Sequence, residues 1–481
     1  MVNIHSLFDG SSDIENEPVG EDDNADLTWS GYLPFYSVYD DTDSRFYNVN
    51  ASFTGSNWTV AYMAFHAKGG SKATIFDSGT NTNIGVLALG ENSDIVLDGT
   101  QVNYIEGWGG VHDITLGSHH TETVRLGGDN VKLKVGSGGV ETIGINADAT
   151  VVIDGRVEAL RISDGDHSIR LKSGQVKFLD LGGNNNTVVV EADTDIAAAR
   201  TYTETGLSKF DIKDGGDMRV LTSNGGDVEI TMEGSGRIRT IEAFEGTLNM
   251  TTDERYVQSL VAYDSVSQIN IGTGGIGAIQ IGSGSGMSHV ISAEGSIDSL
   301  TVFGEDTVKL ALGDGGAGTL RTGKGGDKVN GGNGNVDFLN TRDGNDVVVT
   351  GSGYFGVIHT GEGRDKVTLN GEAGTIRLGG GNDKFFGGSG DDFVVGGSGN
   401  DLMKGGGGDD IFLFSQDSGN DKLRAFKQGD DLMLVHDHEG GFDSLTITKV
   451  GRHKVIEHDG GTIKLLGLGK ADITEDDFSF I

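Results

Sequence analysis

A short apolar pattern, V-x-x-I-x-I, recurs along most of the chain with constant internal steps of three and two residues. Clear copies are Val140-Ile143-Ile145, Val157-Leu160-Ile162 and Ile297-Leu300-Val302. The middle residue returns at intervals of roughly nineteen residues, a period typical of solenoid proteins. It can be followed at Leu87, Ile105, Val124, Ile143, Leu160, Leu179, Ala199, Val220, Ile241, Leu260, Ile279, Leu300, Leu320, Leu339, Ile358, Ile376, Val394 and Phe412.

Each period also contains a second alternating run, such as Leu133 with Val135 and Val151 with Ile153. Short alternating runs bounded by Gly, Asn and Asp indicate strands rather than helices. Two strands per coil of about 18–21 residues predict an all-β fold, a flattened parallel β-solenoid with coils about 4.8 Å apart. Unrelated antiparallel hairpins are the alternative, but they would not keep one pattern through so many coils.

Acidic turns acquire a fixed form, close to G-x-G-x-D, from Leu320 onward. Five aspartates then lie seven residues past their pattern residue, which places them on one edge of the stack: Asp327, Asp346, Asp365, Asp383 and Asp401. Between residues 387 and 413 the half-coils shorten to nine residues, and Asp392 and Asp410 fall on the opposite edge.

Three consecutive units, GGSGDDFVV (387–395), GGSGNDLMK (396–404) and GGGGDDIFL (405–413), resemble the hemolysin-type calcium-binding repeat of the RTX family, GGxGxDxUx. Degenerate copies, TGKGGDKVN, TRDGNDVVV and TGEGRDKVT, extend the resemblance upstream. The resemblance implies that the solenoid grades into an RTX β-roll that binds several Ca²⁺ ions. The implied metal-site residues are Gly323, Gly325, Asp327, Gly344, Asp346, Gly361, Gly363, Asp365, Gly379, Gly381, Asp383, Gly388, Gly390, Asp392, Gly397, Gly399, Asp401, Gly406, Gly408 and Asp410.

Calcium chemistry explains this residue choice. Glycine allows positive φ, so a turn can direct carbonyl groups inward, and Ca²⁺ needs six to eight oxygens. Without metal, carboxylates about 5 Å apart would repel by roughly 3 kcal/mol per pair at an effective dielectric of about 20. We therefore expect Ca²⁺ to drive folding of this segment. A lone Gly-Asp turn is more often a plain turn, and the upstream turns are interpreted as metal-free: Asp129, Asp148, Asp166, Asn185 and Asp227.

The amino-acid composition restricts which molecules the protein can bind. Among 481 residues there are 72 acidic and 36 basic residues and no cysteine, so the net charge is −36 and disulfides and thiolate metal sites are excluded. This charge disfavours nucleic acid and anionic lipid as partners. The first residues carry no cleavable signal pattern, and no stretch is long and apolar enough to cross a bilayer, so no membrane insertion is expected.

The pattern divides the chain into five segments. We expect a flexible acidic N-terminus (1–26), an aromatic-rich N-terminal cap (27–80) that is alternatively a binding surface, and a degenerate β-solenoid (81–318). A calcium-binding RTX β-roll (319–414) and a C-terminal cap (415–481) follow. Acidic Glu475 to Asp477 before Phe478, Phe480 and Ile481 resemble the family's type I secretion signal, which implies export by that machinery.

Enzyme motifs do not emerge. H-E-x-x-H and G-x-S-x-G are absent, and GSGSG at 282–286 has glycine where a nucleophile would stand. His119 with His120 is most simply a polar turn, and His436 with His438 lies in the C-terminal cap, so both pairs are weak candidates for a transition-metal site. Surface pairs such as Arg161 with Asp180 are what any solvated strand face offers.

We therefore expect a secreted, calcium-binding, non-enzymatic protein with a structural, adhesive or assembly-forming role, for example in a surface layer, filament or biofilm matrix. Its expected partners are calcium, and either further copies of itself or cell-surface polysaccharide. The alternative is a polysaccharide lyase or epimerase with its site on a solenoid face. A membrane-damaging toxin is disfavoured, because long amphipathic helical stretches are missing.

Overall fold

The computed structural model describes residues 82–481, apart from 91–92, 283–285, 437–439 and 469–472, together with the backbone of six strands between residues 2 and 77. The chain divides into two compact units, Met1–Gly246 and Thr247–Ile481. Strands dominate both, and among the described residues the helices are two short 3-10 turns. No helix in this part of the chain is long and apolar enough to span a membrane.

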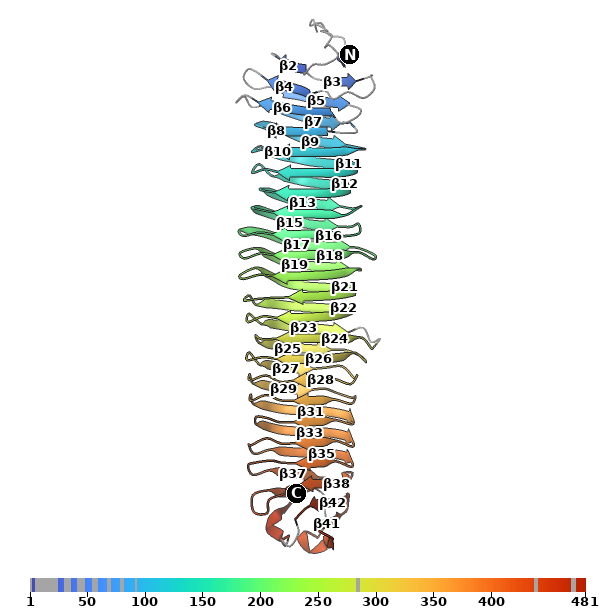
Figure 1. Ribbon diagram of the computed structural model, residues 1–481, viewed down its shortest axis with the longest axis vertical. Helices are drawn as coiled ribbons and strands as arrows, with labels where there is room; N and C mark the ends of the chain where they lie inside the picture. Colours follow the sequence, from blue (N-terminus) through green and yellow to red (C-terminus); the bar gives the residue numbers. More distant parts are fainter. Residues whose placement is uncertain are drawn as a thin grey trace. The chain divides into compact units, whose positions relative to one another are not determined.

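Unit 1 is a stack of parallel coils (Figure 1). Its strands are β1 (Val2–Ile4), β2 (Ala25–Trp29), β3 (Tyr36–Asp40), β4 (Asn48–Phe53), β5 (Thr59–His66), β6 (Ser71–Asp77), β7 (Thr82–Leu89), β8 (Ser93–Asp98), β9 (Thr100–Gly107), β10 (Val111–Leu116), β11 (Thr121–Val135), β12 (Val140–Ile153), β13 (Arg156–Ile162), β14 (His167–Leu171), β15 (Gly174–Leu181), β16 (Asn186–Val190), β17 (Thr194–Tyr202), β18 (Leu207–Ile212), β19 (Asp217–Asn224), β20 (Asp227–Met232) and residues 237–246 of β21 (Arg237–Thr251).

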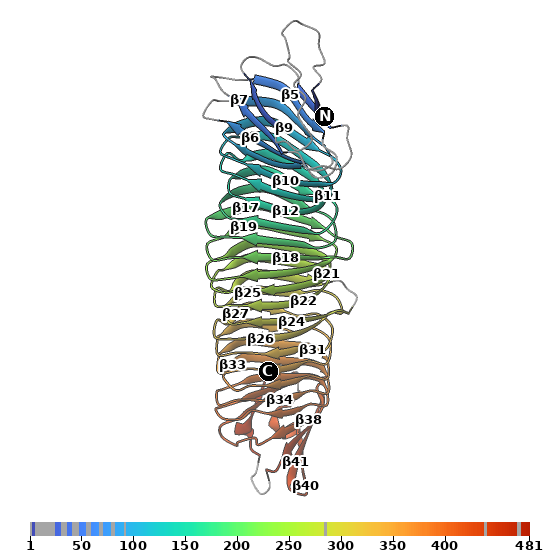
Figure 2. The same cartoon turned by 45° about the horizontal axis from the view of Figure 1, so that its top comes forward.

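Pairing in unit 1 generally joins each strand in parallel to the strand two positions along the chain, as in β13 with β15 and β14 with β16. Two rows of strands result, one from each half of every coil, connected by the turns visible in Figure 2. β11 and β12 continue through their turn and contribute to both rows. Two strands per coil, and the parallel solenoid, are confirmed.

Unit 2 repeats this architecture. Its strands and turns are β22 (Val257–Ile271), β23 (Ile276–Gly282), β24 (Ser288–Ala293), β25 (Ile297–Val302), β26 (Thr307–Leu312), β27 (Ala317–Arg321), β28 (Lys328–Asn330), β29 (Val336–Asn340), β30 (Val347–Val349), β31 (Phe355–Gly363), β32 (Lys366–Thr368), β33 (Ala373–Gly381), β34 (Lys384–Phe386), β35 (Phe393–Gly399), β36 (Leu402–Lys404), β37 (Ile411–Phe414), β38 (Gly419–Arg424), β39 (Leu432–Val435), η1 (Phe442–Ser444), β40 (Thr446–Val450), β41 (His453–His458), β42 (Gly461–Leu466), η2 (Glu475–Asp477) and β43 (Phe478–Phe480).

The core of each unit is the stacked apolar pattern. Leu160 pairs with Leu179 in unit 1, Leu300 pairs with Leu320 in unit 2, and all four side chains are fully buried. Burying each such side chain contributes about 1.5–3 kcal/mol to the free energy of folding. Because each coil buries these side chains against its neighbours, every interface between coils stabilises the solenoid. The predicted pattern residues coincide with the core, with one correction.

The predicted position Val220 is wrong by one residue. Ala199 pairs with Leu221, which pairs with Ile241, whereas Val220 pairs with Thr240. Leu221 is fully buried and Val220 is half-buried. The reason is coil length, because neighbouring residues of this coil lie 22 apart, as in the hydrogen bond from Thr201 to Ser223. This spacing slightly exceeds the predicted coil length.

The two ends of the chain were expected to differ from the solenoid. At the N-terminal end, β2 pairs in parallel with β4 and β4 with β6, so solenoid pairing extends into the segment expected to be a cap. The aromatic side chains of that segment, and most of residues 1–26, lie outside the described residues. At the other end, β40, β41 and β42 form an antiparallel sheet, while β42 and β43 pair in parallel with β38 and β39.

Candidate metal centre

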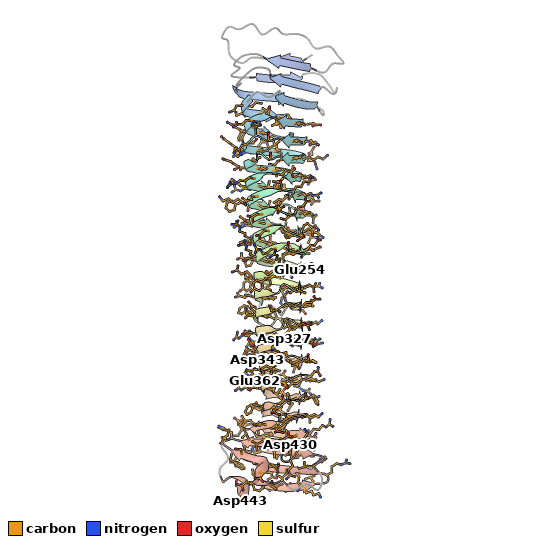
Figure 3. All side chains as sticks on the ribbon, turned by 90° about the vertical axis from the view of Figure 1, so that its left-hand side faces the viewer. Glu254, Asp327, Asp343, Glu362, Asp430 and Asp443 are labelled. Carbon is orange, nitrogen blue, oxygen red and sulfur yellow. The ribbon has the colours of Figure 1, made fainter. Side chains whose placement is uncertain are left out.

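A row of buried aspartates runs through unit 2 at the turn that precedes the short strands β28, β30, β32, β34 and β36. In each coil the backbone N–H of one aspartate donates to Oδ1 of the aspartate in the next coil. The distances are 2.8 Å for Asp346 to Asp365, 2.8 Å for Asp365 to Asp383, and 2.9 Å for Asp383 to Asp401. Figure 3 labels Asp327 in this row, with Asp343 in the turn of the next coil and Glu362 near the end of β31 in the coil after that.

The second carboxylate oxygen of most of these aspartates lacks a hydrogen-bond donor. Asp383 and Asp401 are each 1% exposed, so the unpaired oxygen is also shielded from water. A buried polar atom without a partner costs about 1–3 kcal/mol, and more when it is charged. The unpaired atom is Oδ2 of Asp346, Asp365, Asp383 and Asp401 in this row, of Asp421 in the coil that follows, and of Asp410 in the opposite turn.

At the N-terminal end of the row, the protein itself supplies hydrogen-bond donors to both carboxylate oxygens of Asp327. Thr322 donates its hydroxyl to Oδ2 of Asp327, and the N–H of Val308 donates to Oδ1 at 2.7 Å. One coil earlier, Asp306 accepts from the N–H of Met287 at 2.8 Å and faces Nε2 of His289 at 3.4 Å.

A built-in cation also lies at this end of the row. Arg342 stands where the repeat has its second glycine, and it adopts a positive φ of 62°. Its guanidinium donates to the carbonyl of Val302 at 3.0 Å, and its charge lowers the pKa of Asp327 against the effect of burial. Asp327 therefore has a hydroxyl and a cation that Asp383 and Asp401 do not share.

A second, shorter row crosses the other turn. The N–H of Asp392 donates to Oδ1 of Asp410 at 3.1 Å, and the N–H of Asp410 donates to Oδ1 of Asp431 at 3.3 Å. Oδ2 of Asp431 accepts from the N–H of Lys427 at 2.8 Å. Both carboxylate oxygens of Asp392 are buried without a hydrogen-bond partner. Two aspartate rows in two different turns are as the sequence predicts.

Glycine is required where the turn carbonyls meet the next coil. Gly381 and Gly399 have φ of 130° and 122°, and a Cβ on Gly399 would lie 1.6 Å from the carbonyl oxygen of Gly381. The same contact joins Gly379 and Gly397, at 1.8 Å. A side chain at either position would displace a carbonyl oxygen from the space between coils.

A further glycine leaves room beside each carboxylate in the glycine-rich copies. A Cβ on Gly396 would lie 2.5 Å from Oδ2 of Asp401, and one on Gly405 would lie 1.7 Å from Oδ2 of Asp410. Thr322 occupies the equivalent position beside Asp327, five residues before the aspartate. Glycine thus leaves open the space that the threonine fills.

Burial raises the pKa of these carboxyls well above its ordinary value, so they keep their proton at a higher pH than an exposed aspartate does. It raises the pKa of Asp383 to about 7, that of Asp401 to about 6 and that of Asp421 to about 8. In the second row, burial and then the charge of Asp410 raise the pKa of Asp392 to about 7. Desolvation is the largest cause throughout, because a charged carboxylate here loses its water without gaining a cation.

Ca²⁺ fits the donor set. The turns offer carboxylate oxygens and backbone carbonyls and no nitrogen or sulfur ligand, which suits a hard cation bound by oxygen. No three His, Asp or Glu side chains converge in the described part of the chain. Each ion would therefore have to combine carboxylates with glycine carbonyls of neighbouring coils, and it would compensate the unpaired Oδ2 atoms.

The predicted site residues divide into two groups. The aspartates predicted in each row lie in that row, and the backbone places Gly361, Gly379 and Gly397 in one column. The first glycine pair of each row, Gly323 with Gly325 and Gly388 with Gly390, does not share the positive φ of the glycines in later coils.

Besides Asp477 near the C-terminus, three described aspartates are buried that the sequence pattern did not predict: Asp306, Asp421 and Asp431. Asp421 accepts the N–H of Asp401 at 2.9 Å, so the row continues beyond the predicted segment. The string SGND before Lys422 carries a degenerate copy of the turn and could have revealed it.

Other candidate residues lie outside this centre. The turns with Asp129, Asp148, Asp166, Asn185 and Asp227 are exposed, unlike the buried rows. His120 faces Glu141 at 3.6 Å, and His438 lies outside the described residues. Arg161 and Asp180 form an exposed ion pair at 3.4 Å.

Comparison with known proteins agrees with this geometry. A family model described as the RTX calcium-binding nonapeptide repeat matches four copies, at residues 336–354 and 377–412. These ranges contain Asp346, Asp383, Asp392, Asp401 and Asp410. No curated protein matches the chain significantly. The chain carries RTX calcium-binding repeats within a parallel β-solenoid.

Proposed function

We propose that this chain, with its RTX calcium-binding repeats, is a secreted protein in which Ca²⁺ completes the fold of unit 2. The buried, unpaired Oδ2 atoms of the aspartate rows are the observation that carries this proposal. Without metal, each carboxyl must keep a proton or bury a charge, and both states cost free energy at neutral pH. Ca²⁺ supplies the missing charge at every coil.

The metal ligands are the aspartates of the two rows and the glycine carbonyls between them. In the first row they are Asp346, Asp365, Asp383, Asp401 and Asp421, and in the second Asp392, Asp410 and Asp431. The predicted glycines with positive φ, such as Gly379 and Gly397, would supply backbone carbonyls between coils. Asp327 is a weaker ligand than Asp383 and Asp401, since Thr322 already donates to its second oxygen.

The extracellular role is structural or adhesive. Each unit is a regular solenoid, and a stacked fold of this kind is suited to display a regular surface of repeated coils. Export unfolded, followed by folding where Ca²⁺ is plentiful, is consistent with stability that depends on the metal. Asp477, in the expected secretion signal, is buried and accepts the N–H of Thr474 at 2.8 Å, so the same residues also have a structural role.

Two measurements test this function together: the number of bound Ca²⁺ ions, and the dependence of folding on calcium. Purified full-length protein should bind several Ca²⁺ ions in equilibrium dialysis, and EGTA should remove part of its β-sheet circular dichroism. Electron microscopy with calcium and with chelator then tests the assembly role, with filaments or sheets expected only in calcium. Absence of bound calcium would reject the metal sites, whereas isolated particles in both conditions would reject assembly alone.

The alternative function, a polysaccharide-active enzyme, has one observation in its favour. A hollow on the strand face of unit 1 is lined by Trp108, Arg125, Arg161, Asp180 and Tyr202. Aromatic rings beside arginines suit acidic sugars, and Trp108 is 60% exposed. Incubation with polyuronates, followed by absorbance of unsaturated products and by uronate composition, distinguishes the two functions, because turnover would favour the enzyme.

A further inference from the structure

Lysines form a column on one strand face of unit 2. The backbone register places Lys309 beside Lys328, Lys366 beside Lys384, and Lys422 beside Lys464. Val347 separates the first pair from the second, and Leu402 separates the second from the third. We call these six lysines the lysine column; all point outward, since the residues that follow them are buried.

The face that carries the lysine column has no carboxylate among its outward positions. The neighbouring outward column consists of Ala311, Asn330, Val349, Thr368, Phe386, Lys404 and Arg424. The column lysines form no ion pair with any described carboxylate, and Lys366 instead lies over the ring of Phe386 at 5.9 Å.

Several cations of unit 1 pair with carboxylates of a neighbouring coil. Arg237 binds Asp217 at 2.6 Å, and Lys209 binds Glu229 at 2.8 Å, a residue of the next coil in its own strand row. The chain as a whole carries 72 acidic residues against 36 basic ones, so acidic partners are plentiful. Like charges directly opposite each other destabilise a sheet. Ion pairing within the fold therefore does not explain why lysines lie directly beside each other in three pairs of this column.

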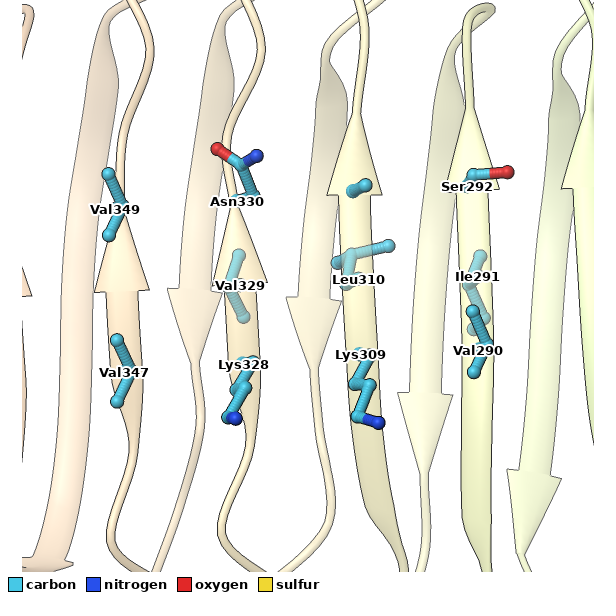
Figure 4. A pocket seen from close by; sticks show the side chains of 11 residues that line it. Val290, Ile291, Ser292, Lys309, Leu310, Lys328, Val329, Asn330, Val347 and Val349 are labelled. Carbon is cyan, nitrogen blue, oxygen red and sulfur yellow. The ribbon is translucent and has the colours of Figure 1, made fainter.

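A shallow hollow lies at one end of this face. Figure 4 shows Lys309 and Lys328 side by side, with Val290 and Val347 flanking them. Asn330 and Val349 line the same hollow. The hollow combines the ammonium groups of Lys309 and Lys328 with valine side chains, of which Val290 is 40% exposed. Such a surface can hold a polymer that has both charged groups and apolar ring faces.

We propose that the lysine column binds a linear acidic polysaccharide that runs along the stack of coils. Within each pair the two lysines lie one interstrand spacing apart, about 4.8 Å, which is close to the length of one sugar ring. A polyuronate can therefore place carboxylates opposite successive lysine pairs. Duplex DNA is less suited, because it carries one charge per about 1.7 Å and would meet the strong negative charge of the whole chain.

This inference depends on a folded unit 2 and so on the proposed calcium sites. The decisive variant replaces four lysines of the column: Lys309→Gln, Lys328→Gln, Lys366→Gln and Lys384→Gln. The matched control removes the same charge from exposed lysines elsewhere: Lys132→Gln, Lys134→Gln, Lys172→Gln and Lys449→Gln. Calcium content and circular dichroism of all three proteins are measured first, so that loss of folding is recognised separately from loss of binding.

Binding is then measured with sodium oligogalacturonate, after gel filtration has removed excess calcium. Wild type and control should bind it with an affinity that falls as salt rises, and should not bind the methyl-esterified oligomer. The column variant should bind at least about tenfold more weakly and with a smaller salt dependence. Equal binding by the column variant would overturn the proposal. So would tighter binding of duplex DNA, or a dimer in sedimentation that only the column variant loses, since the face would then serve another partner.

Discussion

The backbone N–H of Asp383 donates a 2.9 Å hydrogen bond to Oδ1 of Asp401 in the next coil, while Oδ2 of Asp401 is buried without a donor. One oxygen of the carboxylate therefore ties two coils together, and the other is left without a partner. The same division recurs at Asp365 with Asp383. A carboxyl in this state stabilises the stack only when a proton or a metal ion compensates its second oxygen.

Asp401→Asn should change stability in opposite directions with and without calcium. The amide carbonyl can still accept the N–H of Asp383, but it carries no buried charge. Burial raises the pKa of Asp401 from 3.8 to about 6, and about 1.4 kcal/mol per pKa unit gives up to about 3 kcal/mol of stabilisation in chelator at neutral pH. In calcium the variant should lose bound ion and unfold earlier. Thermal unfolding and metal content of the same samples check both statements.

Asp327→Asn is the matched comparison. Thr322 already donates to Oδ2 of Asp327, so this variant should keep the calcium content of wild type, whereas Asp401→Asn should lose ion. A loss as large as that of Asp401→Asn would show that the threonine does not replace the metal.

Metal-free unit 2 should become less stable as pH rises. Burial raises the pKa of Asp383 to about 7 and that of Asp421 to about 8, above the unfolded value of 3.8. Between these values the native state binds more protons than the unfolded state, so its free energy of unfolding falls from about pH 4 to about pH 8. Urea unfolding of stripped, dialysed protein at pH 5 and pH 8 measures this. A free energy of unfolding that rises between pH 5 and pH 8 would contradict the proposal that these buried carboxyls are protonated in the metal-free native state.

Gly399→Ala should disrupt the turn, whereas Gly407→Ala should not. Gly399 has φ of 122°, and its Cβ would lie 1.6 Å from the carbonyl oxygen of Gly381. The variant should lose more than about 2 kcal/mol of stability in calcium, from strain and steric overlap together. Gly407 has an ordinary φ, and its nearest contact would be Ser389 at 3.5 Å. Equal calcium affinity and thermal stability in the two variants would be inconsistent with carbonyls lying between coils.

Leu221→Ala and Val220→Ala test the corrected core position. Leu221 is fully buried, so its truncation should cost about 2–5 kcal/mol, and that of the half-buried Val220 less than about 1.5 kcal/mol. Urea unfolding followed by circular dichroism ranks the two. A larger effect at Val220 would mean that the register of β19 is displaced by one residue.

The fold was largely predictable because the apolar pattern repeats in every coil. Leu179 and Leu300 could be assigned to the core from spacing alone, since each lies about nineteen residues from its neighbours. Val220 was misassigned because two adjacent residues are apolar and this coil is longer. Asp421 and Asp431 were missed because their turns, DSGND (417–421) and KQGDD (427–431), lack the first glycine of the G-x-G-x-D pattern.

The state of the site was less predictable than its position. Sequence indicates carboxylates in turns, which ordinarily face water, yet Asp383 and Asp401 are almost fully buried. The substitution of Thr322 for glycine could be seen in the sequence, but its hydrogen bond to Asp327 depends on side-chain placement. The lysine column likewise becomes visible only when the register places Lys309 beside Lys328.

A crystal structure of the protein grown in calcium, with anomalous scattering to identify the ions, tests the central claim most directly. The account predicts Ca²⁺ between successive coils, with Oδ2 of Asp383 and Oδ2 of Asp401 about 2.3–2.6 Å from an ion. Empty turns at Asp383 and Asp401 in such a crystal, with both carboxylates still buried and unpaired, would contradict it.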